Sequence, residues 1–122
     1  VIAIEYSKPA ISDSQFNSKE VSNIKFITDF AQNGLEKLEE KIDVAILDPS
    51  RSGCDLETIQ SVISKRPRKI AYVSCDPKTL ARDLDIMVNH NYQICSVQPI
   101  DMFPQTSHIE CVTILEPKFL KR

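Results

Sequence analysis

The sequence is poor in glycine, has no closely spaced cysteines and contains no long apolar run. Its two glycines, Gly34 and Gly53, stand apart, so the chain holds no glycine-rich phosphate-binding loop. Four cysteines without a CxxC pair, and only two histidines, argue against a zinc or iron–sulfur site within these residues. No stretch reaches the roughly 18–20 apolar residues that span a bilayer. We see no signal peptide, so we expect reduced thiols and a cytoplasmic location.

An excess of positive charge is also missing. The net charge is −2 and the isoelectric point is near 5.7, which excludes a strongly basic nucleic-acid-binding module. Any RNA contact must therefore come from local groups or from a segment outside this chain. What remains is ordinary globular composition, with 42% hydrophobic and 26% charged residues over a length that suits one domain.

Short apolar, β-branched runs alternate with segments of helical period. We expect strands at 1–4, 24–28, 43–47 and 69–73, and helices at 9–21, 31–41, 56–64 and 77–89. This rhythm predicts a doubly wound α/β fold, and the continuous apolar runs suit parallel strands. Two further strands, 92–99 and 109–115, are joined by the loop 101–108 without a helix and are therefore expected to be antiparallel.

The candidate site residues follow the strands, because open α/β sheets bind ligands at the carboxyl ends of their strands. Cys75 ends the fourth strand and precedes a helix that Asp76 can cap, and the positive end of this helix favours a thiolate. Lys78 and Arg82 could add to that field. A lone cysteine is more often a small buried apolar residue, which is our expectation for the other three, Cys54, Cys95 and Cys111.

Three acids follow the earlier strands. Glu5 could bind the ribose hydroxyls of a nucleoside cofactor, or it could be a solvated acid in a turn. Asp29 could approach an adenine ring, but we favour a solvated acid there. Asp48 leaves its strand into an Asp-Pro turn, three residues before Arg51, which alone is a weak functional signal.

Glu110 lies in the last expected strand on the same face as Val112 and Ile114. A carboxylate at the end of an apolar stripe is partly removed from water and suits proton transfer, although an acid on a water-facing edge fits the same pattern. His108 points to the same face and is expected to be a loop or RNA-contact residue.

Together these segments resemble the RNA (uracil-C5)-methyltransferase family, which contains the ribosomal and transfer RNA 5-methyluridine enzymes. The resemblance covers most of the chain and is carried by three stretches, Asp48-Pro49-Ser50-Arg51-Ser52-Gly53, Val73-Ser74-Cys75-Asp76-Pro77 with Thr79-Leu80-Ala81-Arg82-Asp83, and Asp101-Met102-Phe103-Pro104 with Thr106, His108 and Glu110. Ser50 stands where the family usually has proline, and the 29–32 run also departs from the family pattern. The resemblance implies a Rossmann-like S-adenosylmethionine-dependent methyltransferase fold, with a mostly parallel sheet that ends in an antiparallel hairpin.

The resemblance also implies the reaction. Cys75 would attack carbon 6 of a uracil flipped out of the RNA, and Glu110 would remove the proton from carbon 5 after methylation. Glu5 would hold the ribose of S-adenosylmethionine, Asp48 would lie near its methionine part and the target base, and Arg51 and His108 would support the site. The RNA would be 23S ribosomal RNA in the first instance and transfer RNA as the alternative.

By the same resemblance, residues 1–122 would be the C-terminal part of the catalytic domain. The first strand, its glycine-rich loop, an RNA-binding barrel and any iron–sulfur cysteines would precede Val1. In the family's sheet, that first strand lies between the strands expected at 1–4 and 43–47. We therefore expect weak cofactor binding and no turnover from this chain alone.

Two other classes remain open. The chain could be a catalytically inactive piece that keeps the methyltransferase fold. It could also belong to another Rossmann-like enzyme that uses Cys75 as an acyl or redox nucleophile, a reading weakened by the lack of a histidine partner in a suitable motif and of a nearby resolving cysteine.

Overall fold

The computed structural model describes residues 1–118, which form two compact units. The first unit is Val1–Glu40, and the second begins at Lys41. In the first unit, strands β1 (Ile2–Glu5) and β2 (Lys25–Thr28) pair in parallel, and helix α1 (Lys8–Asn17) connects them. Helix α2 (Ala31–Glu36) follows β2 and lies close to β1, since a Cβ on Gly34 would stand 2.6 Å from Cγ2 of Ile4.

Both helices of this unit end earlier than the sequence predicts. Helix α1 ends at Asn17, where the Ser18 hydroxyl and the Ser18 N–H both bind the Ser14 carbonyl in place of a further turn. Helix α2 ends at Glu36, and the residues beyond it contribute only Leu38 to the buried interior. A charged segment without an apolar stripe has nothing to pack and does not extend a helix.

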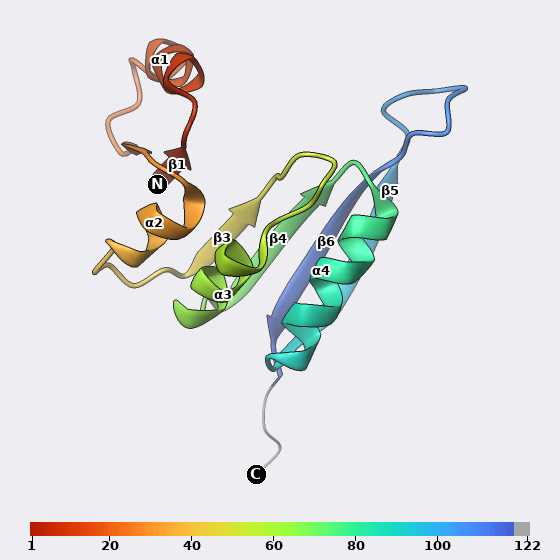
Figure 1. Ribbon diagram of the computed structural model, residues 1–122. Coiled ribbons are helices and arrows are strands. Elements are labelled where there is room, and N and C mark those ends of the chain that lie inside the picture. Colours follow the sequence, from red (N-terminus) through yellow and green to blue (C-terminus); the bar gives the residue numbers. More distant parts are fainter. Residues whose placement is uncertain (119–122) are drawn as a thin grey trace. The chain divides into compact units, whose positions relative to one another are not determined.

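The second unit contains a four-stranded sheet in the order β3-β4-β6-β5 (Figure 1). Its elements are β3 (Val44–Leu47), α3 (Leu56–Ser64), β4 (Lys69–Ser74), α4 (Pro77–Asn89), β5 (Tyr92–Ile100) and β6 (Glu110–Pro117). Strands β3 and β4 are parallel, whereas β6 is antiparallel to both β4 and β5. The predicted sequence of parallel strands and a closing antiparallel hairpin is confirmed.

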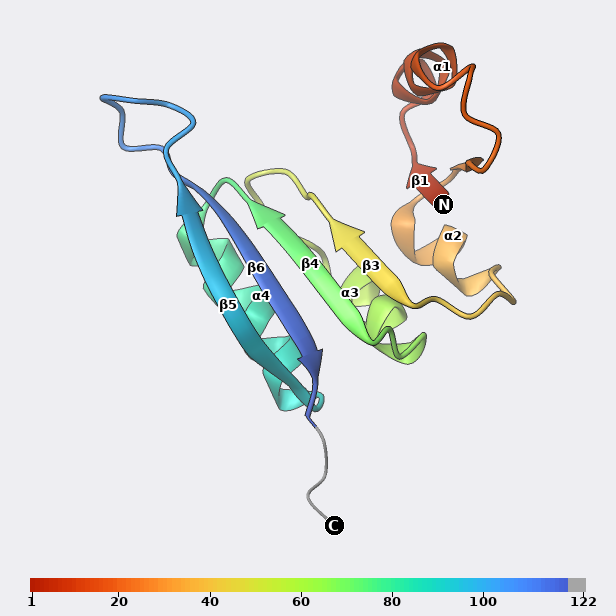
Figure 2. The same cartoon turned by 180° about the vertical axis from the view of Figure 1, so that it is seen from behind.

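Helices α3 and α4 lie on the same face of this sheet, as the two opposite views show (Figures 1 and 2). The core between them is apolar, and its fully or nearly fully buried members are Ile59, Val62, Ile70, Tyr72, Leu80, Leu84, Met87 and Leu115. None of the helices described in this unit covers the opposite face, and on β3 the side chains of Val44 and Ile46 are 45% and 74% exposed. No helix among residues 1–118 is long and apolar enough to cross a membrane.

Helices α3 and α4 begin and end where the sequence predicts, because each has a capping aspartate and an apolar stripe. The Asp55 carboxylate accepts the Thr58 N–H at 2.6 Å. The Asp76 carboxylate accepts the N–H groups of Lys78 and Thr79 at 2.9 and 3.0 Å. These backbone hydrogen bonds, that of Thr79 first, hold the pKa of Asp76 below its usual 3.8.

The cysteines differ from one another in burial. Cys111 is buried as predicted and Cys54 is partly buried, but the prediction for Cys95 is wrong, because its side chain is exposed. Cys95 is the extra residue where the β5–β6 register shifts between Ile94 and Ser96. Such a bulge leaves one residue unpaired and changes the face to which side chains point.

Candidate active site

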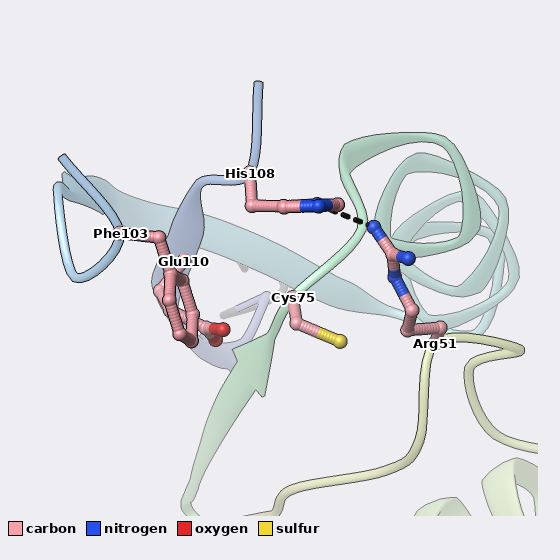
Figure 3. A pocket seen from close by; sticks show the side chains of 5 residues that line it. All are labelled: Arg51, Cys75, Phe103, His108 and Glu110. Carbon is pink, nitrogen blue, oxygen red and sulfur yellow. Dashed lines mark hydrogen bonds between the residues drawn. The ribbon is translucent and has the colours of Figure 1, made fainter. Parts of the chain in front are cut away.

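An open pocket of about 400 Å³ is lined by five residues that come from distant parts of the sequence, Arg51, Cys75, Phe103, His108 and Glu110 (Figure 3). Its size falls within the roughly 300–1,000 Å³ typical of small-molecule sites. It lies at the carboxyl end of β4, the position where open α/β sheets bind their ligands. Four of the five residues, all except Phe103, were predicted to belong to one site.

Cys75 lies in a turn between β4 and α4 that local hydrogen bonds hold in place. The buried hydroxyl of Ser74 donates to the Asp76 carbonyl at 2.9 Å and accepts the Asp76 N–H at 3.1 Å. The Asp76 side chain then caps α4. Cys75 is thus fixed by hydrogen bonds between its two neighbours and stands directly before the start of helix α4.

The antiparallel pairing of β6 with β4 brings Glu110 close to this turn. Ser74, the last residue of β4, pairs with Cys111, so the start of β6 lies beside the end of β4. Glu110 is the first residue of β6 and is only partly exposed. A thiol and a carboxylate that are 35 positions apart in the sequence therefore line the same pocket.

Arg51 and His108 also line the pocket and contact each other. The guanidinium Nη2 of Arg51 lies 2.6 Å from Nδ1 of His108 (Figure 3). An arginine side chain only donates hydrogen bonds, so Nδ1 of His108 is the acceptor and the proton of the neutral ring is on Nε2. The predicted supporting residues thus contact each other.

Phe103 is the residue that the sequence reasoning missed. Its ring meets that of His108 edge to face, with centroids 6.3 Å apart. The Thr106 hydroxyl donates to the Phe103 carbonyl at 2.7 Å and accepts the His108 N–H at 3.2 Å, which fixes the loop between β5 and β6. An aromatic residue in the loop before a candidate base was the signal that could have identified it.

The two predicted cofactor-binding acids do not line this pocket. Asp48 follows β3 and is exposed. Glu5 ends β1 in the other unit, where its Oε1 accepts the Ser7 N–H at 2.7 Å. Asp29 binds Lys37 at 2.6 Å, and this hydrogen bond is the main reason that its pKa is lowered. These local contacts account for Asp29 without a ligand. Among residues 1–118, no cluster of three or more metal-ligating side chains is present.

Residues 1–118 match the family described as tRNA (Uracil-5-)-methyltransferase. The chain belongs to this family. Its curated relatives include an uncharacterised RNA methyltransferase of Caldanaerobacter subterraneus subsp. tengcongensis, 43% identical over 95% of this chain, and one of Oceanobacillus iheyensis, 40% identical over 97%. The chain spans 27% of the length of each.

Solved structures agree with the fold. The tRNA (uracil-54, C5)-methyltransferase of Pyrococcus abyssi, in complex with S-adenosyl-L-homocysteine, matches 94% of this chain and 28% of its own with a TM-score of 0.82 and 29% identity. An rRNA methylase from Streptococcus thermophilus matches 97% of this chain and 73% of its own, with a TM-score of 0.76. At 16% identity, the second likeness concerns the fold alone. The fold is that of Rossmann-like S-adenosylmethionine-dependent methyltransferases.

Proposed function

We propose that the protein methylates carbon 5 of a uridine in RNA, with Cys75 as the nucleophile and Glu110 as the base. The observation that carries this proposal is the pairing of a thiol at a helix start with a carboxylate in one pocket, in a chain of the RNA uracil-5 methyltransferase family. The acyl or redox alternatives for Cys75 have no comparable support.

The chemistry requires both groups. Carbon 5 of uracil is a weak nucleophile until the Cys75 thiolate adds to carbon 6, which places the electron pair on carbon 5. Carbon 5 then takes a methyl group and still carries its proton. Glu110 removes that proton, the electron pair re-forms the carbon 5–carbon 6 double bond, and the sulfur–carbon 6 bond breaks to return the thiolate. An open pocket of about 400 Å³ has room for a base that has left its stack.

S-adenosylmethionine supplies the methyl group, which is bonded to its positively charged sulfonium sulfur and is therefore open to attack by carbon 5. The Pyrococcus abyssi enzyme in complex with S-adenosyl-L-homocysteine supports this cofactor for the family. Glu5 and Asp48 fit the role of holding it, since each is a carboxylate at the carboxyl end of a parallel strand, and carboxylates accept hydrogen bonds from ribose hydroxyls and from an ammonium group. Glu5 would bind the ribose and Asp48 the methionine part.

RNA that contains 5-fluorouridine tests the proposal in the full-length protein. Fluorine takes the place of the proton that Glu110 removes, so the methylated adduct cannot collapse and a covalent RNA–protein complex should persist on a denaturing gel. Cys75→Ala should abolish the complex, whereas Cys95→Ala, which removes an exposed thiol outside the pocket, should leave it intact. A complex that survives Cys75→Ala would refute the assigned nucleophile.

Glu110→Gln separates the base from the nucleophile. With ordinary uridine RNA, this variant should form the adduct but release it slowly, because the carbon 5 proton has no acceptor. Full turnover by Glu110→Gln would refute the assigned base. The same assay run with 23S ribosomal RNA and with transfer RNA distinguishes the two candidate targets.

A further inference from the structure

The loop that carries Arg51 is fastened to helix α4 by side chains outside the pocket. The Thr79 hydroxyl donates to the Arg51 carbonyl at 3.1 Å. Nη2 of Arg82 donates to the carbonyls of Ser52 and Cys54, both at 3.0 Å. Helix α4 thus binds the carbonyls of three residues of this loop, Arg51, Ser52 and Cys54.

Asp83 is the centre of these contacts. Its side chain is fully buried, and its Oδ2 accepts the Cys54 N–H at 2.8 Å and the hydroxyl of Tyr72. Its Oδ1 accepts Nε of Arg82 at 2.8 Å. Positions 79, 82 and 83 share one face of a helix, which is why a single surface of α4 can hold the loop.

Gly53 allows the loop to approach this closely. It has φ of +75°, and a Cβ there would stand 2.6 Å from Oδ2 of Asp83 and 2.7 Å from Nη2 of Arg82. A residue with a side chain would push the loop away from the pair. The chain has only two glycines, and one of them lies against the Arg82–Asp83 pair.

The loop in turn determines where Arg51 can reach. The Arg51 carbonyl accepts a hydrogen bond from α4. The Arg51 guanidinium donates to Nδ1 of His108, which lies 57 positions later in the sequence. We propose that Arg82 and Asp83 are positioning residues, which keep Arg51 in contact with His108 and so set the His108 ring at the mouth of the Cys75 pocket. This inference rests on the proposed methylation, in which His108 would contact the RNA through its Nε2–H.

A coupling measurement in the full-length protein tests the inference. Arg82→Lys keeps the charge of a half-exposed side chain, so the protein should fold, but a single ammonium cannot replace the guanidinium at two carbonyls and a carboxylate. Because misplacing a supporting group by about 1 Å can cost on the order of 100-fold, we expect at least a ~10-fold lower kcat for methylation. In an Arg51→Ala background, Arg82→Lys should lower kcat by less than about twofold, since the Arg51 side chain through which Arg82 acts is already absent.

Asp83→Asn, with Asp85→Asn as its matched control two positions along the helix, gives a second pair. Asp85 is exposed and accepts a hydrogen bond from the Asn89 side chain at 3.3 Å, away from the Arg51 loop, so Asp85→Asn should leave kcat unchanged. Equal losses from Arg82→Lys in the two Arg51 backgrounds would overturn the inference, because the pair would then act on stability rather than through Arg51.

A readout that needs no activity separates this inference from the proposed function. The nitrogen chemical shifts of His108 should report one Nε2-protonated tautomer in the wild type and a mixture in Arg82→Lys. An unchanged His108 signature in that variant would overturn the inference. Failure of the wild-type protein to trap 5-fluorouridine RNA would count against the proposed function instead.

Discussion

At the scale of single residues, Thr113 is a buried polar group whose hydroxyl is unpaired. It is fully buried on β6, and among residues 1–118 its hydroxyl is the one buried side-chain atom without a hydrogen-bond partner. Because an unpaired buried hydroxyl costs roughly 1–3 kcal/mol, we expect Thr113→Val to raise the free energy of unfolding by about 1 kcal/mol in urea denaturation. Thr113→Ser, which keeps the hydroxyl and loses the methyl, should lower it. A stabilising serine would contradict this account.

Cys54 makes the stability depend on alkaline pH. Burial is the main cause that raises the pKa of its thiol from 9.0 to about 11, with the charges of Asp83 and Asp55 adding to it. The unfolded thiol ionises first, so its contribution is complete below about pH 9 and is lost as the pH rises to about 11. Burial and the hydrogen bond to Asp83 also raise the pKa of Tyr72, so its ionisation adds to the loss of stability at alkaline pH.

Urea midpoints measured across this range should therefore fall less steeply in Cys54→Ala than in the wild type. Cys95→Ala serves as the control, because it removes a thiol that is exposed and not part of the buried interior. An identical slope in Cys54→Ala and in the wild type would contradict the assignment.

At the scale of elements, the stability of helix α3 depends on the residue that precedes it. Asp55 caps α3, and the helix buries Ile59 and Val62 against the sheet. Loss of the cap in Asp55→Ala should lower the free energy of unfolding by about 1 kcal/mol, whereas Asp55→Ser should retain most of it. Chemical denaturation checks both. Equal destabilisation by the two substitutions would show that the cap is not the cause.

The elements that were predicted well are those whose signals are local. Helices α3 and α4 have capping aspartates and apolar stripes, so their bounds could be read from the sequence. Helix α1 buries only Ile11, and without a stripe its end could not be located. The bulge at Cys95 could not be predicted from the sequence either, because a change of register depends on the partner strand.

The site divides in the same way. Cys75 and Glu110 became candidates because one follows a strand and the other lies at the start of one, and because the family resemblance assigns both a role. The pairing of β4 with β6 brings the two into one pocket. The contact between Arg51 and His108 joins residues 57 positions apart, and the hydrogen bond that holds the Arg51 loop to Asp83 joins residues 29 positions apart. No periodicity or local motif encodes such pairings, and they became apparent only from the folded chain.

At the scale of the whole molecule, the two units have separate sheets. Strands β1 and β2 form one and β3, β4, β6 and β5 the other, with no strand pairing between the two among residues 1–118. The carboxylates proposed to hold the cofactor are divided between them, with Glu5 in the first unit and Asp48 in the second. The chain spans 27% of the length of the curated relatives named above, and residues 1–122 contain no glycine-rich loop that could hold the cofactor.

We therefore expect this chain by itself to bind S-adenosylmethionine more weakly than micromolar and to form no adduct with 5-fluorouridine RNA. Calorimetric titration of the chain beside the full-length protein measures the first expectation, and the gel assay measures the second. In this chain alone, Glu5→Gln and Asp48→Asn should then change the affinity for S-adenosylmethionine little, since neither acid is part of a complete cofactor site. In the full-length protein, each should weaken cofactor binding. Micromolar binding by the chain alone would contradict this expectation.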